Sequence, residues 1–295
     1  MIITLLCGGA VLAALLGLLV YTLWVEPRRL LVLRQELALP PGFAFDRPVR
    51  LLHVSDLHLT GRELDKSRRL RRIGRLEVDL AVITGDFIET NAGIDAVRRA
   101  LRHLKPPHGV YAVFGNHDYY VYGLRDLFFP RRSGPASAQS ERLAAVLESL
   151  GVNVLRNAHR AVPVAGGRLV LIGLDDYYSD RHDLDAAFAG APEDGFRILL
   201  SHSPDIVELL GERRVQLVLA GHTHGGQVRL PVLGTPVTRS GLSAEHVSGL
   251  SQHAGTPVHV TRGVGSGLWT PMRFRCLPEV SILYLCPAPA GPARD

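Results

Sequence analysis

The sequence predicts an α/β fold, a four-layer αββα sandwich in which two mixed β-sheets are flanked by helices, preceded by one N-terminal transmembrane helix. Three observations lead to this prediction. Apolar runs of strand length alternate with amphipathic stretches of helical spacing, polar clusters follow directly after the apolar runs, and a long uncharged segment precedes them all. We expect an anchor over residues 1–26, a linker over 27–48, a folded domain over 49–288 and a C-terminal tail over 289–295.

The first apolar segment is typical of a membrane span, because no charged side chain occurs from Ile2 to Val25. About 20 such residues cross the hydrocarbon core at about 1.5 Å per residue. The run exceeds the roughly 7–15 residues of a signal-peptide core, and no small-residue cleavage site follows it. Arg28, Arg29 and Arg34 follow the span, so the positive-inside rule predicts a single-pass protein of the cell membrane with a cytoplasmic domain. A buried core helix is the alternative.

The rest of the chain contains strands and helices in alternation. Apolar runs predict strands over residues 51–54, 80–83, 110–114, 168–174, 196–200, 215–220, 258–260 and 280–285. Helical spacing of apolar residues predicts helices over 64–76 and 94–104. The first half therefore has a βαβαβ order, which implies parallel strands with right-handed crossovers. We assign the last two runs to the second sheet, and a two-sheet sandwich with outer helices is the simplest packing of this order.

Neither the net charge nor the cysteine content points to a particular partner or cofactor. The net charge is +5 and the pI about 9.4, a modest surplus that solvated surfaces explain better than nucleic-acid binding. The sequence has no recognisable nucleic-acid module, and no nucleic-acid partner is expected. Cys7, Cys276 and Cys286 have neither the spacing of a metal motif nor that of a disulfide framework.

Five polar motifs follow predicted strands, at the sheet edge where open α/β folds bind ligands. They are Asp56-Leu57-His58, Gly85-Asp86, Gly115-Asn116-His117-Asp118, His202 and Gly221-His222-Thr223-His224. Alternate residues of an extended segment point the same way, so we expect Asp56 and His58 to reach one ion together, and His222 and His224 likewise. Carboxylate, imidazole and amide ligands without a thiolate suit Mn²⁺, Fe or Zn²⁺.

The number of ligands predicts two divalent metal ions rather than one. Seven side chains are too many for one tetrahedral ion, but they suit two ions that share a carboxylate. Asp86, from the central motif, is the expected bridge. Two ions roughly 3.5–4 Å apart generate a hydroxide near neutral pH and bind both the entering and the leaving oxygen at phosphorus.

Together the DLH, GD, GNHD, His202 and GHTH motifs resemble the signature of the calcineurin-like metallophosphoesterases over about residues 51–225. Three later segments resemble the membrane-anchored bacterial branch of that family: Gly225-Gly226-Gln227, Arg262-Gly263-Val264-Gly265 and Pro278-Glu279-Val280. The resemblance implies an active enzyme, a metal-dependent phosphoesterase or phosphodiesterase, because no position of the ligand pattern departs from the family.

The resemblance also implies a role for each site residue. The first metal ion would be held by Asp56, His58, Asp86 and His224, and the second by Asp86, Asn116, His202 and His222. His117 would lie beside the phosphate as a catalytic proton donor or oxyanion stabiliser. Asp118 would orient His117, although a carboxylate at this position could instead cap the following helix.

The expected reaction is cleavage of a phosphodiester or pyrophosphate bond by a metal-bridging hydroxide at the membrane surface, on a phosphorylated small-molecule or lipid-linked substrate. One alternative is a specific UDP-2,3-diacylglucosamine pyrophosphatase, since some relatives hydrolyse this precursor of lipid A. From other classes, a non-catalytic metal-binding membrane scaffold and a nuclease remain alternatives.

Two further segments have both a functional and a structural interpretation. Residues 119–140 form a long connection rich in aromatic residues and arginine, and they either overhang the metals or pack on the domain surface. The arginine-rich face of the helix predicted over 64–76 is either solvated or rests on anionic lipid.

Overall fold

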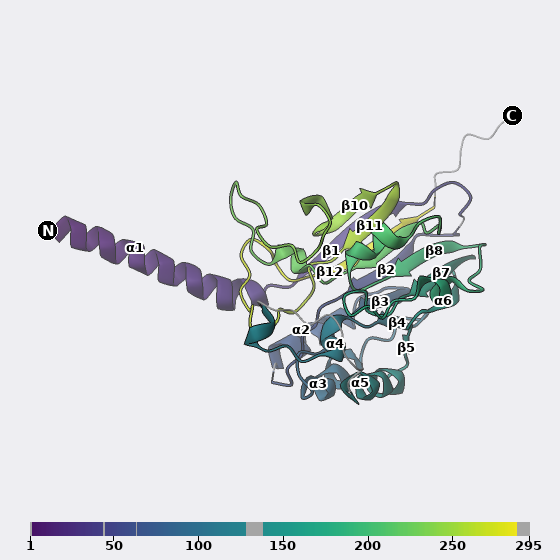
Figure 1. The fold of residues 1–295 in the computed structure, drawn as a ribbon, viewed down its shortest axis with the longest axis horizontal. Coiled ribbons are helices and arrows are strands. Elements are labelled where there is room, and N and C mark those ends of the chain that lie inside the picture. The colour runs from purple at the N-terminus through teal and green to yellow at the C-terminus, as the bar shows by residue number, and fades with distance from the viewer. Residues whose placement is uncertain (1, 44, 63, 128–137, 288–295) are drawn as a thin grey trace.

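The computed structural model describes residues 2–43, 45–62, 64–127 and 138–287. The predicted C-terminal tail over 289–295 and the middle of the long connection over 119–140 lie outside the described residues. The chain consists of one long N-terminal helix, which projects from a two-sheet domain (Figure 1).

Helix α1 (Ile2–Val20) continues through a π-helical turn, η1 (Tyr21–Val25), into a 3₁₀ turn, η2 (Glu26–Arg28). The segment Leu6–Arg28 has a mean hydropathy of 2.2 and is long and apolar enough to cross a membrane. Length and composition of one such helix fit a membrane anchor, and they also fit a signal sequence. The side chains of residues 4 and 6–20 are exposed, so this part of α1 does not pack in the core of the domain.

The first sheet contains six strands in the order β1-β12-β2-β3-β4-β5. Strands β2 to β5 are parallel to one another, and β12 pairs with β2 antiparallel and with β1 parallel, so the sheet is mixed. Its strands are β1 (Leu31–Ala38), β2 (Val49–Val54), β3 (Leu80–Thr84), β4 (Val110–Val113), β5 (Val152–Val154) and β12 (Glu279–Cys286).

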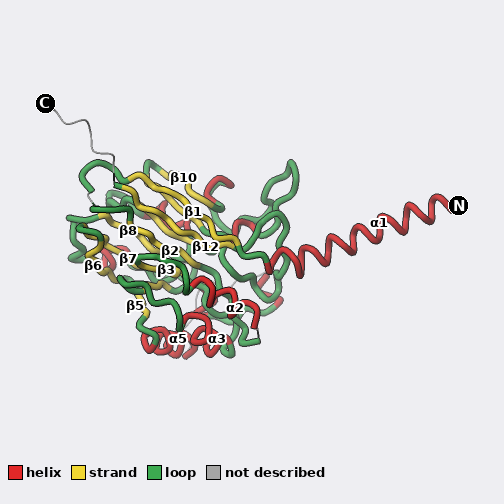
Figure 2. The backbone as a smooth tube through the Cα atoms, turned by 180° about the vertical axis from the view of Figure 1, so that it is seen from behind, coloured by secondary structure: helices red, strands yellow, loops and turns green. Residues whose placement is uncertain are grey.

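Helices cover the outer face of the first sheet with apolar side chains. They are α2 (Leu64–Ile73), α3 (Gly93–Leu101) and α5 (Ala138–Ser149). Figure 2 shows these helices together along one side of the strands. The short helix α4 (Asn116–Tyr119) and the 3₁₀ turn η3 (Leu124–Leu127) follow β4. The helices predicted over 64–76 and 94–104 are thus present, with later residues in turns.

The second sheet also contains six strands, in the order β10-β11-β9-β8-β7-β6, and it is mixed as well. Its strands are β6 (Ala158–Val164), β7 (Gly167–Gly173), β8 (Phe196–Leu200), β9 (Leu217–Ala220), β10 (Gly249–His253) and β11 (Thr256–Val260). Its outer face packs against α6 (Leu184–Phe188) and the 3₁₀ helix η4 (Pro204–Leu209).

A buried core lies between the two sheets. Leu51 and Val82 of the first sheet belong to the same apolar cluster as Leu171, Ile198 and Leu219 of the second. The predicted four-layer αββα sandwich is therefore confirmed, because helices and 3₁₀ turns cover the outer face of each sheet.

Two sequence-based assignments are wrong. The predicted linker over 27–48 contains β1, an edge strand whose eight residues pair with β12, so residues 31–38 belong to the folded domain. The run over 280–285, assigned to the second sheet, forms β12 of the first sheet, between β1 and β2. Both errors have one physical cause, since the chain returns to its own beginning and sequence order does not reveal such long-range pairing.

Candidate metal centre

The backbone turns sharply at five of the predicted metal ligands, directly after the strands end. Asp56 and His58 follow β2 with φ angles of 53° and 43°, and Asp86 follows β3 with a φ of 53°. His222 and His224 follow β9 with φ angles of 66° and 52°. These residues therefore adopt left-handed conformations and not the extended backbone that the sequence predicted. Such conformations cost roughly 1–3 kcal/mol each and concentrate at functional sites. Asp56 and His58 still reach one point together, as expected, but His222 and His224 do not, because His222 contacts His202 and His224 contacts His58.

Glycines next to these residues allow the loops to approach closely. A Cβ atom on Gly85, whose φ is 86°, would lie 2.6 Å from the amide nitrogen of Gly115 and 2.8 Å from His202 Nδ1. A Cβ atom on Gly221 would lie 2.0 Å from Ser55 Oγ. Any other residue at either position would push the loops apart.

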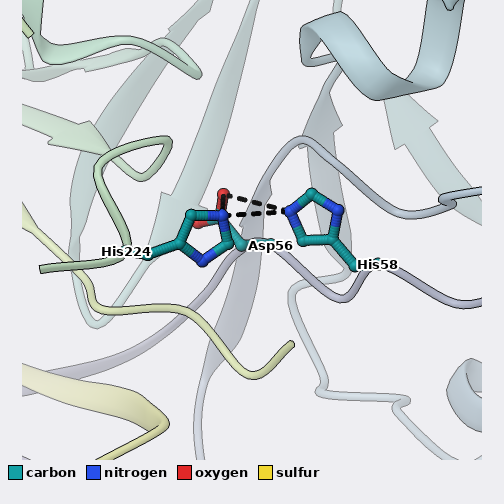
Figure 3. Close-up of side chains that lie close together, drawn as sticks. All are labelled: Asp56, His58 and His224. Carbon is teal, nitrogen blue, oxygen red and sulfur yellow. Dashed lines mark hydrogen bonds and ion pairs between the residues drawn. The ribbon is translucent and has the colours of Figure 1, made fainter. Parts of the chain in front are cut away.

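The first group of predicted ligands consists of Asp56, His58 and His224, all buried (Figure 3). The Nε2 atoms of His58 and His224 are 3.1 Å apart. Asp56 Oδ1 lies 3.6 Å from His224 Nε2 and 4.0 Å from His58 Nε2. Three side chains from β2 and β9 thus direct ligand atoms at one point.

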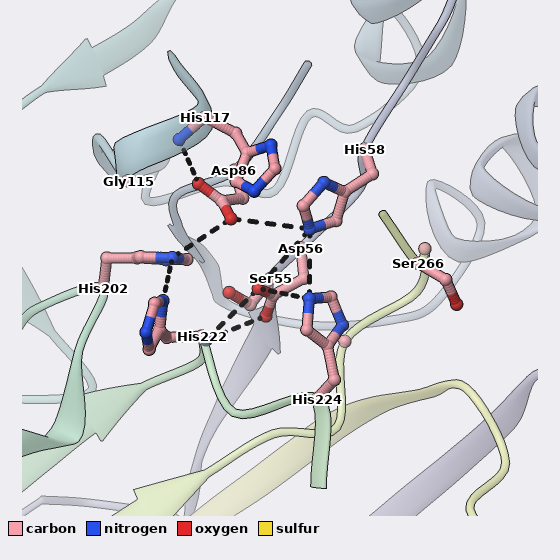
Figure 4. Close-up of polar contacts among 12 residues, drawn as sticks. Ser55, Asp56, His58, Asp86, Gly115, His117, His202, His222, His224 and Ser266 are labelled. Atoms are coloured by element: carbon pink, nitrogen blue, oxygen red, sulfur yellow. Dashed lines mark hydrogen bonds and ion pairs between the residues drawn. The ribbon is translucent and has the colours of Figure 1, made fainter. Parts of the chain in front are cut away.

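The second group lies on the other side of Asp86 (Figure 4). His202, directly after β8, places its Nε2 atom 3.1 Å from His222 Nδ1 and 3.2 Å from Asp86 Oδ2. Asn116 follows β4 and is buried, and its Oδ1 atom has no hydrogen-bond partner among the described residues.

Asp86 connects the two groups. Its Oδ2 atom lies 3.4 Å from His58 Nε2 of the first group and 3.2 Å from His202 Nε2 of the second. Its Oδ1 atom accepts a hydrogen bond of 2.9 Å from the backbone N–H of His117. One carboxylate oxygen therefore lies between the two sets of ligand atoms, the position that the sequence predicted for a bridge.

The hydrogen bonds of the histidines fit metal ligation. His202 Nδ1 donates to the carbonyl oxygen of Thr84 at 2.7 Å, and His58 Nδ1 contacts Glu89 Oε2 at 2.6 Å. In a neutral imidazole the Nε2 atom then carries the lone pair, and both Nε2 atoms face Asp86 Oδ2. Lone pairs directed at a carboxylate repel it unless a cation lies between them. Metal-bound histidines characteristically donate their other N–H to a carboxylate or a backbone carbonyl.

The electrostatics of the pocket favour the neutral, metal-binding form of two histidines and the protonated form of a third. Burial lowers the pKa of His222 to about 3 and also lowers that of His224. Burial alone would lower the pKa of His202, but the negative charges of Asp86 and Asp56 outweigh it and raise this pKa to about 10. Burial alone would raise the pKa of Asp86, but the neighbouring His202 and His117 hold it well below its usual range. Metal binding would release the proton held at His202, since imidazole ligates metals in its neutral form.

Sequence reasoning missed Glu89, whose carboxylate lies beside the rings of His58 and His117. Its Oε2 atom contacts His58 Nδ1 at 2.6 Å and His117 Nδ1 at 3.0 Å. Its Oε1 atom accepts a hydrogen bond of 2.8 Å from the backbone N–H of Leu268. The signal in the sequence is only a glutamate three residues after Asp86.

The expectation that Asp118 orients His117 is not met. The Asp118 carboxylate accepts hydrogen bonds from the backbone N–H groups of Asp86, Phe87 and Gly115, at 2.8–3.0 Å. It therefore fixes the loop that carries Asp86 and closes the first turn of its own helix, α4, whereas the alternative interpretation expected it to cap the following helix. The carboxylate beside the His117 ring is that of Glu89.

His117 lies at the edge of the buried cluster and faces a cavity. Its ring packs against Tyr122, with ring centroids 4.6 Å apart, and 18% of its side chain is exposed. Burial alone would lower the pKa of His117, but Asp86 and Glu89 outweigh this effect and raise it.

The cavity above the ligands has a volume of about 990 Å³. Its floor includes Asp86, Asn116, His222 and other predicted ligands, and its walls carry aromatic side chains and one arginine. The wall residues used below are Tyr122, Tyr177, Tyr178, Trp269, Val237 and Arg239.

Comparison with known proteins agrees with this geometry. The family model of calcineurin-like phosphoesterases matches residues 49–226, which is more than half of the chain and contains every predicted ligand. The chain belongs to the calcineurin-like phosphoesterase family. Members of this family are metal-dependent hydrolases of phosphate esters. In this phosphoesterase, histidine and aspartate side chains that suit metal binding lie close together among the described residues.

Relatives of this phosphoesterase match most of the chain. The uncharacterized metallophosphoesterase YkoQ of Bacillus subtilis is 31% identical, over 81% of this chain and 84% of the relative. UDP-2,3-diacylglucosamine pyrophosphatase LpxG of Chlamydia trachomatis is 30% identical, over 88% and 90%. Phosphodiesterase YaeI of Escherichia coli is 28% identical, over 90% and 92%.

Proposed function

We propose that this phosphoesterase is a dinuclear-metal-dependent hydrolase of phosphodiester or pyrophosphate bonds that acts at the membrane surface. The observation that carries the proposal is the position of Asp86 Oδ2, which lies within 3.4 Å of one histidine from each ligand group. One ion site would consist of Asp56, His58, Asp86 and His224, and the other of Asp86, Asn116, His202 and His222. Mn²⁺, Fe and Zn²⁺ suit these ligands.

Each residue then has a defined task. Two divalent ions, when bound, lower the pKa of a water molecule and neutralise charge on the phosphoryl oxygens. His117, between the ligands and the cavity, donates a proton to the leaving oxygen or a hydrogen bond to a phosphoryl oxygen. Asp118 keeps the Asp86 loop in place through backbone hydrogen bonds.

The cavity favours a substrate that is larger than inorganic phosphate. A volume of about 990 Å³ is at the upper end of the range of about 300–1,000 Å³ for small-molecule sites. The aromatic rings of Tyr122, Tyr177, Tyr178 and Trp269 offer surfaces for a base or a sugar, and Arg239 offers a positive charge for phosphate. The second candidate function is therefore hydrolysis of UDP-2,3-diacylglucosamine, the activity named for the chlamydial relative.

We further propose that α1 is an uncleaved anchor with the domain on the cytoplasmic side. The exposed Arg28 and Arg29 directly after the apolar segment support this orientation. A substrate carried by the bilayer would then be held at the same surface as the enzyme.

A substrate panel tests the proposed function. The full-length protein in detergent is stripped of metal, reconstituted with Mn²⁺, Zn²⁺ or Fe²⁺, and assayed with an aryl phosphodiester and with UDP-2,3-diacylglucosamine. We expect metal-dependent hydrolysis of at least one substrate, and loss of that activity in His222→Ala, which folds normally. Preference for the glycolipid by orders of magnitude would select the second candidate. Metal binding without hydrolysis of either would contradict the proposal and favour a non-catalytic scaffold.

A further inference from the structure

One segment that lines the cavity, through Gly267, Trp269 and Thr270, contacts the end of the N-terminal helix. The backbone N–H of Arg273 donates to the carbonyl oxygen of Thr22 at 2.9 Å, and the N–H of Cys276 donates to Glu26 Oε1 at 2.5 Å. Thr22, Glu26 and the side chain of Arg273 are buried. The segment over residues 264–276 is thus packed against the last turns of the apolar helix, so it lies at the level where that helix leaves the membrane.

A second loop, over residues 228–240, is joined to this segment. The N–H of Arg229 donates to the carbonyl of Phe274, and the N–H of Phe274 donates to the carbonyl of Gln227, both at 2.9 Å. Gln227 Nε2 donates to the carbonyl of Thr270 at 2.9 Å. The loops that follow β9 and β11 lie at the end of the domain from which α1 projects (Figure 1). The two loops and the end of the anchor therefore form one face.

The tip of the second loop is an apolar turn that faces solvent. Backbone hydrogen bonds between Leu230 and Gly234, at 2.7 Å and 3.0 Å, close the turn. Val232 and Leu233 at its tip are 105% and 76% exposed. Val232 also has a φ of 70°, a conformation that β-branched residues very rarely adopt. Neither packing within the domain nor backbone preference explains a valine at this position.

Other exposed apolar side chains surround the same face. Leu268, Trp269 and Met272 of the segment over 264–276 are 50%, 44% and 39% exposed, and Trp24 at the end of the anchor is 63% exposed. Tryptophan is enriched at the membrane–water interface, where its ring is apolar and its N–H remains hydrated. An apolar turn, one tryptophan beside the helix and one at the end of the helix are typical of a surface that contacts a membrane.

We propose that residues 228–237 of the second loop, which we call the hairpin, enter the lipid headgroup region next to the anchor, so that the cavity opens onto the bilayer surface. The inference rests on the proposed role of α1 as a membrane anchor. Val237 and Trp269 belong both to this face and to the cavity wall. A lipid-borne substrate therefore passes from the bilayer along apolar side chains to the metal centre, while its phosphates turn toward the ligands at the floor.

Fluorescence quenching in the full-length protein tests the contact directly. Trp24→Phe and Trp269→Phe first remove the native tryptophans. Val232→Trp then adds one reporter, and the protein is placed in nanodiscs of phosphatidylcholine and phosphatidylglycerol. The matched control is Ala254→Trp, an exposed residue with a φ of 48° in the turn between β10 and β11. That turn lies at the opposite edge of the sheet, because β11 runs parallel to β9 toward the metal centre.

Lipids with bromine on their acyl chains quench only tryptophans that contact them. Since interfacial elements insert about 5–10 Å into the headgroup and acyl boundary, we expect roughly twofold quenching of the reporter at position 232 and none at position 254. Equal emission from the two reporters would overturn the proposal. A blue shift at position 232 without quenching, seen only in discs with two chains, would show that a second copy covers the hairpin, and would also overturn it.

The anchor has its own control, because native Trp24 alone reports on it in the Trp269→Phe protein. Unquenched Trp24 would show that α1 lies outside the bilayer and would remove the basis of the inference. The quenching needs no turnover, so failure of the proposed hydrolysis is detected separately, with the soluble aryl phosphodiester.

Discussion

Buried carboxylates have opposite surroundings at the two ends of the parallel strands, which we call the first edge, where the strands end, and the second edge, where they begin. At the edge where the parallel strands end, Asp86, His58 and His202 direct ligand atoms at one another, and the buried Asn116 Oδ1 has no partner among the described residues. At the edge where the strands begin, Asp79 directly precedes β3, and every part of its carboxylate is engaged. Both of its oxygens accept hydrogen bonds of 2.9 Å from the Arg47 guanidinium, and Oδ2 accepts one of 2.8 Å from the N–H of Arg50.

The backbone differs in the same way. Asp56, His58, Asp86, His222 and His224 have left-handed φ angles at the first edge, whereas Arg47, Arg50 and Asp79 are not among the described non-glycine residues with positive φ. Strained backbone and unmatched polar atoms raise the free energy of the folded chain, so the fold must stabilise them elsewhere. One edge therefore provides stability, and the other uses part of it to hold ligand atoms ready for metal and substrate.

The largest expected effect comes from Asp86, the residue shared by both ligand groups. Asp86→Ala removes the carboxylate whose Oδ2 atom lies within 3.4 Å of a histidine from each group, and loss of metal-ion catalysis costs several kcal/mol, or roughly 10³-fold in kcat or more. Circular dichroism should show a retained fold. The control is Asp185→Ala, an exposed carboxylate paired with Arg213, which should keep full activity. Near-normal turnover of Asp86→Ala would show that the first edge is not the catalytic one.

Glu89 separates positioning from ligation at that edge. Glu89→Gln keeps the size of the side chain but removes the charge behind His58 and His117. Loss of a residue that orients a metal-bound histidine lowers metal affinity or activity by about 10–100-fold. Titration with Mn²⁺, followed by kcat and KM at saturating metal, separates the two causes. A control, Glu245→Gln, changes an exposed glutamate beside His246, and equal behaviour of both variants would show that Glu89 has no positioning role.

The sequence predicted which side chains gather at the first edge but not what surrounds them. Short motifs such as Gly221-His222-Thr223-His224 encode ligand identity locally, and each follows a strand, so their convergence can be inferred. Glu89 has no motif, because its role depends on a loop that returns 31 residues after His58. Residues 31–38 were predicted as linker because their pairing partner, β12, lies near the other end of the chain.

At the second edge, the expected effect is on stability. Asp79→Asn removes charge-assisted hydrogen bonds from a side chain that is 2% exposed, which should lower the free energy of unfolding by about 2 kcal/mol. Activity per folded molecule should stay unchanged, because Asp79 precedes the first residue of β3, whereas the ligand Asp86 follows the opposite end of that strand. Thermal unfolding in detergent and a turnover assay at a temperature below the transition measure both. A loss of kcat without a loss of stability would contradict the division between the edges.

Stability at low pH sharpens the same comparison. Burial alone would raise the pKa of Asp79, but the hydrogen bonds from Arg47 and Arg50 hold it well below its usual range. The contribution of Asp79 to stability is therefore complete above about pH 4, the value of an unfolded aspartate, and is lost as the pH falls from there toward the lowered pKa. The wild-type protein should lose stability over this window, and Asp79→Asn should lose less. Parallel curves for the two proteins would show that Asp79 is not linked to unfolding.

The smallest effect is expected at another carboxylate of the second edge. Asp194 lies just before β8 and pairs with Arg168, as Asp79 pairs with Arg47. The side chain of Asp194 is 78% exposed, however, and that of Arg168 is 45% exposed. Exposed pairs contribute about 0–1 kcal/mol because water and salt screen them. Asp194→Asn should therefore shift the free energy of unfolding by less than about 0.5 kcal/mol, and 0.5 M salt should remove even that difference. If Asp194→Asn destabilised the protein as much as Asp79→Asn, burial would not be the property that lets a carboxylate at this edge stabilise the fold.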